Sequence, residues 1–237
     1  DVLLAGASGK GATAVVDAAI ALAGRAVGPE REQCESLLRS LQREMAPGKQ
    51  RERIQDALYE TTKLDDHVML WEIAGPFSAA ATDSPPLYTA PFPPEPGENG
   101  KRVRWTLLDS RKSPSKAWEV DLNKALGTGS QCVAYMRTRV WVEDGISVRM
   151  ELGSDDGVKV WLNDVVAHEH DVARPVRVAE DRVDVQLARG WNDVLVKVVQ
   201  IGGNWGGCLR FRTLDNGSVP GLKVTVGRHT QVIGNRD

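Results

Sequence analysis

The chain has 237 residues, of which 41% are hydrophobic and 26% charged, and its formal net charge is −2 at pH 7. This composition is typical of a globular protein, and the length suits one large domain or two modest ones. The balanced charge gives no electrostatic case for a nucleic-acid partner, and no apolar run approaches the roughly 20 residues of a membrane span. The chain starts at Asp1 without a signal peptide, so we expect a processed chain or a piece of a longer one.

Residues 1–66 are predicted to form an α-helical segment. Three stretches, 12–24, 30–45 and 49–62, each place apolar residues on one helical stripe. The stripe is clearest in the second stretch, which Pro47 and Gly48 follow. Short helices with Ala- and Leu-lined faces resemble the end of a HEAT-like repeat array. Such a segment would cap a longer array or dock on the following domain.

The composition changes near residue 67, since all seven Trp residues follow this point. A first strand is predicted at 68–74, ended by Gly75-Pro76, and 78–100 is predicted to be a long surface loop. Short strands separated by turn residues are then predicted at 102–108, 117–121, 132–142, 146–153, 157–163, 165–170, 181–188, 192–201 and 207–213. Apolar and polar residues alternate strictly in 146–152. The fold class predicted for 67–213 is therefore mainly β, an antiparallel jelly-roll-like β-sandwich.

The remaining features leave alternatives open. The tail 214–237 either adds one strand at 222–226 or frays. Cys132 and Cys208 both lie in predicted strands, where they either pair or serve as small buried apolar residues. Cys34 lies in the helical segment.

Four segments carry a resemblance to a known family. They are WEIAGPF (71–77), CVAYMRTRVWV (132–142), ELGSDDGVKVWLN (151–163) and RVDVQLARGWNDVLVKVVQIGGNWGGCLRFR (182–212). In this order they resemble a non-catalytic β-sandwich module appended to bacterial carbohydrate-active enzymes and to HEAT-repeat proteins of the cell envelope. The SDDG core is similar to protective-antigen-type and GLEYA-like lectin domains. The resemblance covers residues 71–213 and implies carbohydrate binding in a secreted or cell-envelope protein.

The resemblance implies a metal site at Asp155 and Asp156, because an Asp-Asp pair coordinates Ca²⁺ in the lectin-like relatives. Two adjacent carboxylates suit a hard cation, and Gly157 lets the backbone turn sharply. We expect the SDDG turn to be presented at the rim of the sandwich. Because calcium takes about six or more oxygens, other loops would contribute, with Asn163, Asp164 and Asn204 as candidates. The alternative is that Asp155 accepts backbone N–H bonds and shapes the turn.

A sugar ligand also needs an exposed aromatic ring. Trp205 is the first candidate because it lies in the Gly-rich stretch IGGNWGG, and its alternative role is a lid over one end of the sandwich. Trp161 is the second, since it alternates out of phase with Val158, Val160 and Leu162 and is expected on the open face. Asn163 and Asn204 complete the predicted ligand-binding set.

Other chemistries are less well supported by the sequence. Gly6, Gly9 and Gly11 follow an apolar run, but the order of the glycines is wrong for a dinucleotide fingerprint and another helix follows. His168 and His170 would share one face of a strand as a metal pair, with a solvated strand edge as the alternative.

The sequence thus favours a non-catalytic carbohydrate-binding accessory module, whose partners are a polysaccharide or glycan and the rest of a parent chain. Two alternatives stay open. One is a structural or protein-interaction module that caps a helical array. The other is a polysaccharide-active hydrolase whose site is not recognised, with Asp155 and Glu169 as the carboxylate pair to inspect.

Overall fold

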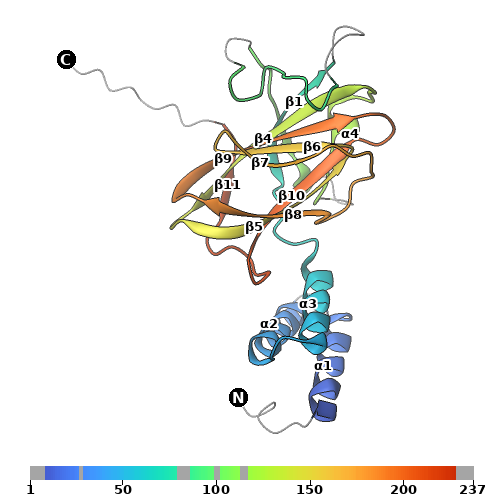
Figure 1. Ribbon diagram of the computed structural model, residues 1–237, viewed down its shortest axis with the longest axis vertical. Coiled ribbons are helices and arrows are strands. Elements are labelled where there is room, and N and C mark those ends of the chain that lie inside the picture. Colours follow the sequence, from blue (N-terminus) through green and yellow to red (C-terminus); the bar gives the residue numbers. More distant parts are fainter. Residues whose placement is uncertain (1–8, 27–28, 79–85, 99–101, 113–116, 228–237) are drawn as a thin grey trace, which may run out of the picture. The chain divides into compact units, whose positions relative to one another are not determined.

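The computed structural model describes residues 9–26, 29–78, 86–98, 102–112 and 117–227, and the chain divides into two compact units, Asp1–Asp65 and Asp66–Asp237 (Figure 1). Gly6, the end of the tail and parts of the predicted loop 78–100 lie outside the described residues.

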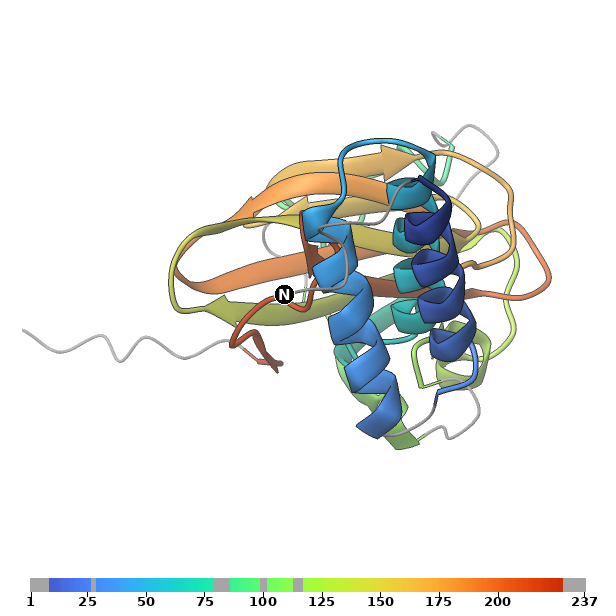
Figure 2. The same cartoon turned by 90° about the horizontal axis from the view of Figure 1, so that it is seen from below.

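The first unit contains three helices, α1 (Gly9–Ala23), α2 (Pro29–Glu44) and α3 (Lys49–Thr62), and all three helical stretches of the sequence are confirmed. The helices pack side by side, as Figure 2 shows. Their apolar stripes meet in a small core that contains Val16, Leu38, Leu41, Ile54 and Leu58. Within the helices that the structure describes, none is long and apolar enough to cross a membrane.

The second unit consists of two antiparallel sheets (Figure 1). One has seven strands in the order β2-β1-β4-β9-β6-β7, with β11 also paired to β4, and the other has four in the order β3-β10-β5-β8. The strands are β1 (Leu70–Phe77), β2 (Thr106–Asp109), β3 (Val120–Asp121), β4 (Cys132–Val142), β5 (Ile146–Asp155), β6 (Val158–Leu162), β7 (Val165–His170), β8 (Asp181–Leu187), β9 (Gly190–Gln200), β10 (Gly206–Thr213) and β11 (Lys223–Thr225).

The main core lies between the two sheets. Alternate residues of each strand point inward, so that Met150 and Phe211 oppose each other in the four-stranded sheet, and Met136 and Val196 do so in the seven-stranded sheet. These alternating apolar sets bury one face of each sheet against the other. The predicted β-sandwich is therefore confirmed.

Some local features differ from the sequence-based expectations. Gly75-Pro76 does not end the first strand: β1 continues to Phe77, and its register against β4 shifts between Ala74 and Phe77. A bulge therefore absorbs the residues that were expected to stop the strand. A short helix, α4 (Leu122–Leu126), was not predicted, and Asp121 caps it by accepting a hydrogen bond from the backbone N–H of Lys124 at 2.9 Å.

The expected strand in 222–226 is present as β11, which pairs with β4. Cys132 and Cys208 are both buried, and the described part of the chain contains them as free thiols. Burial raises the pKa of the Cys208 thiol to about 12, so this thiol is protonated and unreactive at neutral pH.

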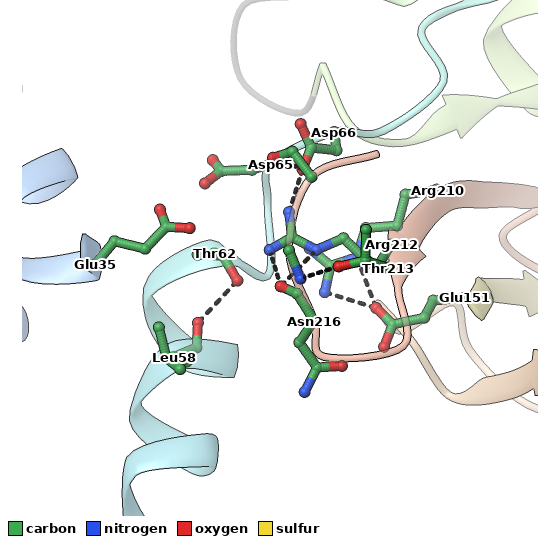
Figure 3. A network of polar contacts seen from close by, with 12 residues as sticks. Glu35, Leu58, Thr62, Asp65, Asp66, Glu151, Arg210, Arg212, Thr213 and Asn216 are labelled. Carbon is green, nitrogen blue, oxygen red and sulfur yellow. Dashed lines mark hydrogen bonds and ion pairs between the residues drawn. The ribbon is translucent and has the colours of Figure 1, made fainter. Parts of the chain in front are cut away.

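The outer face of the four-stranded sheet carries buried charges (Figure 3). Arg210 of β10 binds Glu151 of β5 at 2.7 Å, and both side chains are almost fully buried. The neighbouring Arg212 contacts the carboxylate of Asp66 and the backbone carbonyl of Asn216. These contacts fasten the start of the second unit to β10, and the three side chains of Glu151, Arg210 and Arg212 are buried.

Candidate functional site

The SDDG turn lies beneath another segment and is not presented at the rim. Asp155 and Asp156 are each only 6% exposed. The carboxylate of Asp156 accepts hydrogen bonds from the backbone N–H groups of Arg174 at 3.1 Å and Ile201 at 2.8 Å. A Cβ atom on Gly153 would lie 1.8 Å from the backbone oxygen of Arg177, so segment 171–180 packs directly on the turn.

The expectation that this turn is exposed is therefore wrong, because segment 171–180 folds across it. The peptide bond between Asp155 and Asp156 is cis. Burial, together with the charge of Asp156, raises the pKa of Asp155 to about 6, although a hydrogen bond from the backbone of Val176 acts in the opposite direction. Calcium binding at this pair stays a prediction.

Trp205, the first aromatic candidate, is only 2% exposed and belongs to the core between the sheets. The expectation of an exposed ring is wrong. Trp205 has the same parity as Leu209 and Phe211, so strand alternation continues inward through the Gly-rich stretch. This alternation was visible in the sequence and outweighs the argument from neighbouring glycines. Asn204, beside it, is exposed.

Asn163 closes the turn between β6 and β7. Its side chain accepts a hydrogen bond from the backbone N–H of Asp193 at 2.8 Å and donates one to Asn192 at 2.9 Å. Its φ of 51° is left-handed, as is that of Asp164, which suits a tight hairpin turn. The side chain of Asn163 therefore has a structural task in the turn, and its predicted role in ligand binding stays a prediction.

Trp161 lies on the outer face of the seven-stranded sheet, as alternation predicted, but the expectation that its ring is exposed on that face is wrong. It packs in a second apolar cluster with Tyr135, Val199 and Phe92 and is only 5% exposed, because segment 86–98 covers most of the ring. One edge of Trp161 contributes to the wall of a groove. The structure thus separates the predicted residues: Trp161 reaches this groove, whereas Trp205 lies in the core and Asp155 and Asp156 lie under segment 171–180.

The groove runs along the outer face of the seven-stranded sheet. It consists of a narrow hollow of about 80 Å³ and an adjoining wider one of about 520 Å³, which share Pro94, Trp105, Arg137 and Asp164 as lining residues. Small-molecule sites typically occupy about 300–1,000 Å³ and combine apolar walls with a few polar groups. The wider hollow has that size, and the shared residues provide both kinds of wall.

Arg137 is the central polar residue of the groove. Its position on β4 directs it outward, and its Nε donates to the carboxylate of Glu72 on β1 at 2.7 Å. Its guanidinium lies 4.0 Å from the ring centroid of the half-buried Trp105, a cation–π contact. The ion pair and the ring hold each other in place, which gives the groove a preformed polar and aromatic wall.

A second ion pair lies along the same groove. Arg139 of β4 binds Asp193 of β9 at 2.7 Å, and the exposed Asp164 lines both hollows. Carboxylates accept strong hydrogen bonds from hydroxyl groups, and guanidinium groups donate strong hydrogen bonds to them. The groove therefore offers donors, acceptors and an aromatic face within one surface.

Segment 86–98 forms the other wall, and the buried Lys197 holds it. The ammonium group of Lys197 donates to the carbonyl of Tyr88 at 3.1 Å, to the carbonyl of Ala90 at 2.7 Å and to the carboxylate of Glu95 at 2.8 Å. Burial lowers the pKa of Lys197 more than Glu95 raises it. The hydroxyl of Tyr135 also donates to Glu95.

Sequence reasoning missed Trp105 and Arg137. A usable signal was present in 132–142, where Tyr135, Arg137 and Arg139 alternate with the buried Ala134 and Met136. The pattern assigns an aromatic and cationic set to one face of a strand whose other face is apolar. What the sequence lacked was the partner strand that brings Glu72, and the segment that brings Trp105.

A separate cluster lies where β7 leads into β8. His168, His170 and Asp181 have donor atoms that all lie within 4.8 Å of one another. Asp181 is 3.3 Å from Nε2 of His168 and 2.9 Å from Nδ1 of His170. Burial tends to raise the pKa of Asp181, but hydrogen bonds from Arg174 and His170 lower it to about 2. The three residues together have the donor atoms of a metal-binding group.

For His168 and His170 the sequence leaves a metal pair and a solvated strand edge as alternatives. His170 is exposed, which fits such an edge, whereas His168 is half-buried. Asp181 was not predicted as a third group, because it lies eleven residues beyond His170, at the start of the next strand.

No protein-family model matches the chain, and no curated protein matches it. Among solved structures it is similar to the PA14 domain of the MpAFP antifreeze protein, at 12% identity and a TM-score of 0.31 over 35% of this chain and 44% of that one. It is similar to a family 35 carbohydrate binding module from an environmental isolate, at 13% identity and a TM-score of 0.32 over 46% and 88%.

An anti-sigma factor domain-containing protein is also similar, at 16% identity and a TM-score of 0.38 over 68% of this chain and 46% of that one. The chain thus spans less than half the length of the first and third of these structures. The likeness is one of fold: a β-sandwich that resembles PA14 and carbohydrate-binding modules.

Proposed function

We propose that the second unit is a non-catalytic carbohydrate-binding module and that the groove beside Trp105 is its binding surface. The observation that supports the proposal is the wall in which Trp105, Arg137 and Glu72 hold one another next to a hollow of about 520 Å³. The C–H face of a pyranose ring packs on an aromatic face, and charged side chains bind its hydroxyl groups.

The proposed ligand is a polysaccharide or glycan outside the cytoplasm, as the resemblance of residues 71–213 to envelope and secreted modules implies. In that setting the module would raise the effective concentration of a partner domain of the parent chain near the glycan. As part of the same proposal, the helical unit is the end of a HEAT-like repeat array in the parent chain.

Calcium at Asp155 and Asp156 forms a separate part of the proposal. Asp156 already accepts two backbone hydrogen bonds, and both carboxylates are buried under segment 171–180. Calcium would therefore have to displace part of this segment or replace these hydrogen bonds to bind. Glycan binding at the groove does not require it, so the two parts are tested independently.

The test is a glycan array probed with the full chain, followed by affinity measurements on the best ligand. Trp105→Ala is expected to weaken binding at least tenfold, since it removes the aromatic face. Trp141→Ala is the matched control, because Trp141 also lies on an outer face under a cation, Lys223 at 4.2 Å, but does not line the groove.

Unchanged affinity in Trp105→Ala would place the glycan elsewhere. The absence of any glycan ligand would overturn the proposal and favour the protein-interaction alternative. Repeating the measurement in EDTA tests the calcium part: a loss of affinity would support it, and unchanged binding would remove it while leaving the groove in place.

A further inference from the structure

The cluster at the start of β8 contains the elements of a metal site. His168 and His170 are two residues apart on β7, and both rings contact the carboxylate of Asp181. We infer that His168, His170 and Asp181 bind a divalent transition-metal ion of the zinc class. This inference is independent of the glycan-binding groove.

The spacing of the donor atoms fits a small tetrahedral ion. In a tetrahedral zinc site with bonds of about 2.0–2.1 Å, neighbouring ligand atoms are about 3.3 Å apart. Oδ2 of Asp181 lies 3.3 Å from Nε2 of His168, and Oδ1 lies 2.9 Å from Nδ1 of His170. With one ligand atom taken from each residue, the three atoms lie within 4.8 Å of one another. Small side-chain movements would therefore suffice to close the three donors around one ion.

The chemistry of the donors selects the class of metal. Two imidazole nitrogens and one carboxylate oxygen suit zinc, nickel or copper, whereas calcium takes six or more oxygens. Three protein ligands leave a fourth position for water or an external ligand. The side chain of His170 is 46% exposed, which gives an ion a route from solvent to the cluster.

The Nε2 atom of His168 provides an independent indication. It is buried, and within the part of the chain that the structure describes it has no hydrogen-bond partner. The carboxylate of Asp181 lies 3.3 Å from it. Buried ring nitrogens are normally satisfied, and a metal ion bound to this atom would supply the missing partner.

Arg174 competes for the same place. Its guanidinium donates to both oxygens of Asp181 and lies 3.4 Å from Nδ1 of His170. A carboxylate has about four lone-pair sites, so Asp181 can keep one bond to Arg174 while it binds an ion. The guanidinium must then leave the vicinity of Nδ1, after which it orients the ligand from outside the site. Its positive charge lowers the affinity for the ion.

The test uses the full chain without an affinity tag and titrates Zn²⁺ against a chromogenic chelator. We expect one ion per chain, bound at least tenfold more weakly by His168→Gln and His170→Gln. Glu169→Gln is the matched control, because Glu169 lies between the histidines but pairs with Lys159. Arg174→Gln is expected to bind more tightly, and Ca²⁺ is not expected to compete.

Equal zinc affinity in the wild type and both histidine variants would overturn the inference, as would the absence of binding at micromolar Zn²⁺. Melting curves recorded without metal show whether each variant is folded. We expect the His170 variant to lose less stability than the His168 variant, because the side chain of His170 is more exposed. Cobalt absorption adds a second measurement: nitrogen and oxygen ligation without thiolate bands is expected, whereas thiolate bands would assign the ion to a cysteine.

Discussion

The outer face of each sheet carries an Arg–Glu ion pair, and the two pairs differ in how far they are exposed to solvent. Arg210 binds Glu151 on the four-stranded sheet at 2.7 Å, and the side chains are 2% and 3% exposed. Arg137 binds Glu72 on the seven-stranded sheet, also at 2.7 Å, with exposures of 32% and 20%. An Arg–Glu pair is thus almost fully buried on one sheet and partly exposed on the other, so we expect its loss to reduce stability more on the four-stranded sheet.

The largest effect is expected from breaking the buried pair. Among the residues that the structure describes, Arg210→Met leaves Glu151 with the more distant Arg182 as its ion-pair partner, at 3.5 Å. Removing one partner of a buried pair costs about 3–5 kcal/mol, and we expect roughly 3 kcal/mol because Arg182 remains. Chemical denaturation measures the change, which a loss below about 1 kcal/mol would contradict.

The next effect concerns the segment that closes the SDDG turn. Gly153→Ala would place a Cβ atom 1.8 Å from the backbone of Arg177, so segment 171–180 must move. We expect a loss of about 2 kcal/mol from overpacking. Gly207→Ala on the neighbouring strand is the control, since its nearest contact would be 3.4 Å. Equal melting temperatures for the two variants would show that the segment does not seal the turn.

A smaller, pH-dependent effect is expected from Asp155. Its pKa is raised from 3.8 to about 6 in the folded protein. The folded state therefore holds this proton more tightly than the unfolded state, and the free energy of unfolding falls as the pH rises from about 4 to 6. The rise corresponds to at most roughly 3 kcal/mol, and we expect about 1 kcal/mol because local rearrangement relieves part of the burial.

Melting temperatures at several pH values measure this dependence, which Asp155→Asn should remove. The variant is expected to be more stable than the wild type at pH 7 and no more stable at pH 4. The opposite sign would mean that the carboxylate is better solvated than its burial indicates. An increase in the melting temperature of the wild type on addition of Ca²⁺ at pH 7 would support the predicted calcium site.

The smallest effect on stability is expected from the open pair. Arg137→Met removes a part-exposed ion pair, which typically contributes less than about 1 kcal/mol. The same change removes the charged group above Trp105 and is expected to weaken glycan binding. A large loss of stability would show that Arg137, like Arg210, stabilises the fold, and would contradict the expected difference between the two ion pairs.

The sequence predicted the sandwich because each strand repeats a local pattern. Alternating residues such as Val148 and Met150 face inward wherever the strand is placed, so the fold class follows without knowledge of strand order. The same reasoning placed Trp161 on the outer face. Applied consistently, it would also have placed Trp205 in the core.

The candidate site was harder to predict because it depends on contacts between distant segments. Glu72 and Arg137 meet only because β1 pairs with β4. The burial of Asp155 depends on how segment 171–180 folds back, which no periodic pattern encodes. Local residue types therefore suggested an exposed turn, whereas the tertiary fold buried it.

Lys197 has a consequence for how the shape of the groove can change. It joins β9 to segment 86–98 through carbonyl groups of Tyr88 and Ala90 and through Glu95, and it uses no side chain of the sandwich core for this purpose. Insertions or substitutions in segment 86–98 at positions other than Tyr88, Ala90 and Glu95 would reshape one wall of the groove while the strands beneath it stay unchanged. The sequence of segment 86–98 can therefore vary without changes in the strands, as long as the ammonium group of Lys197 keeps its three contacts.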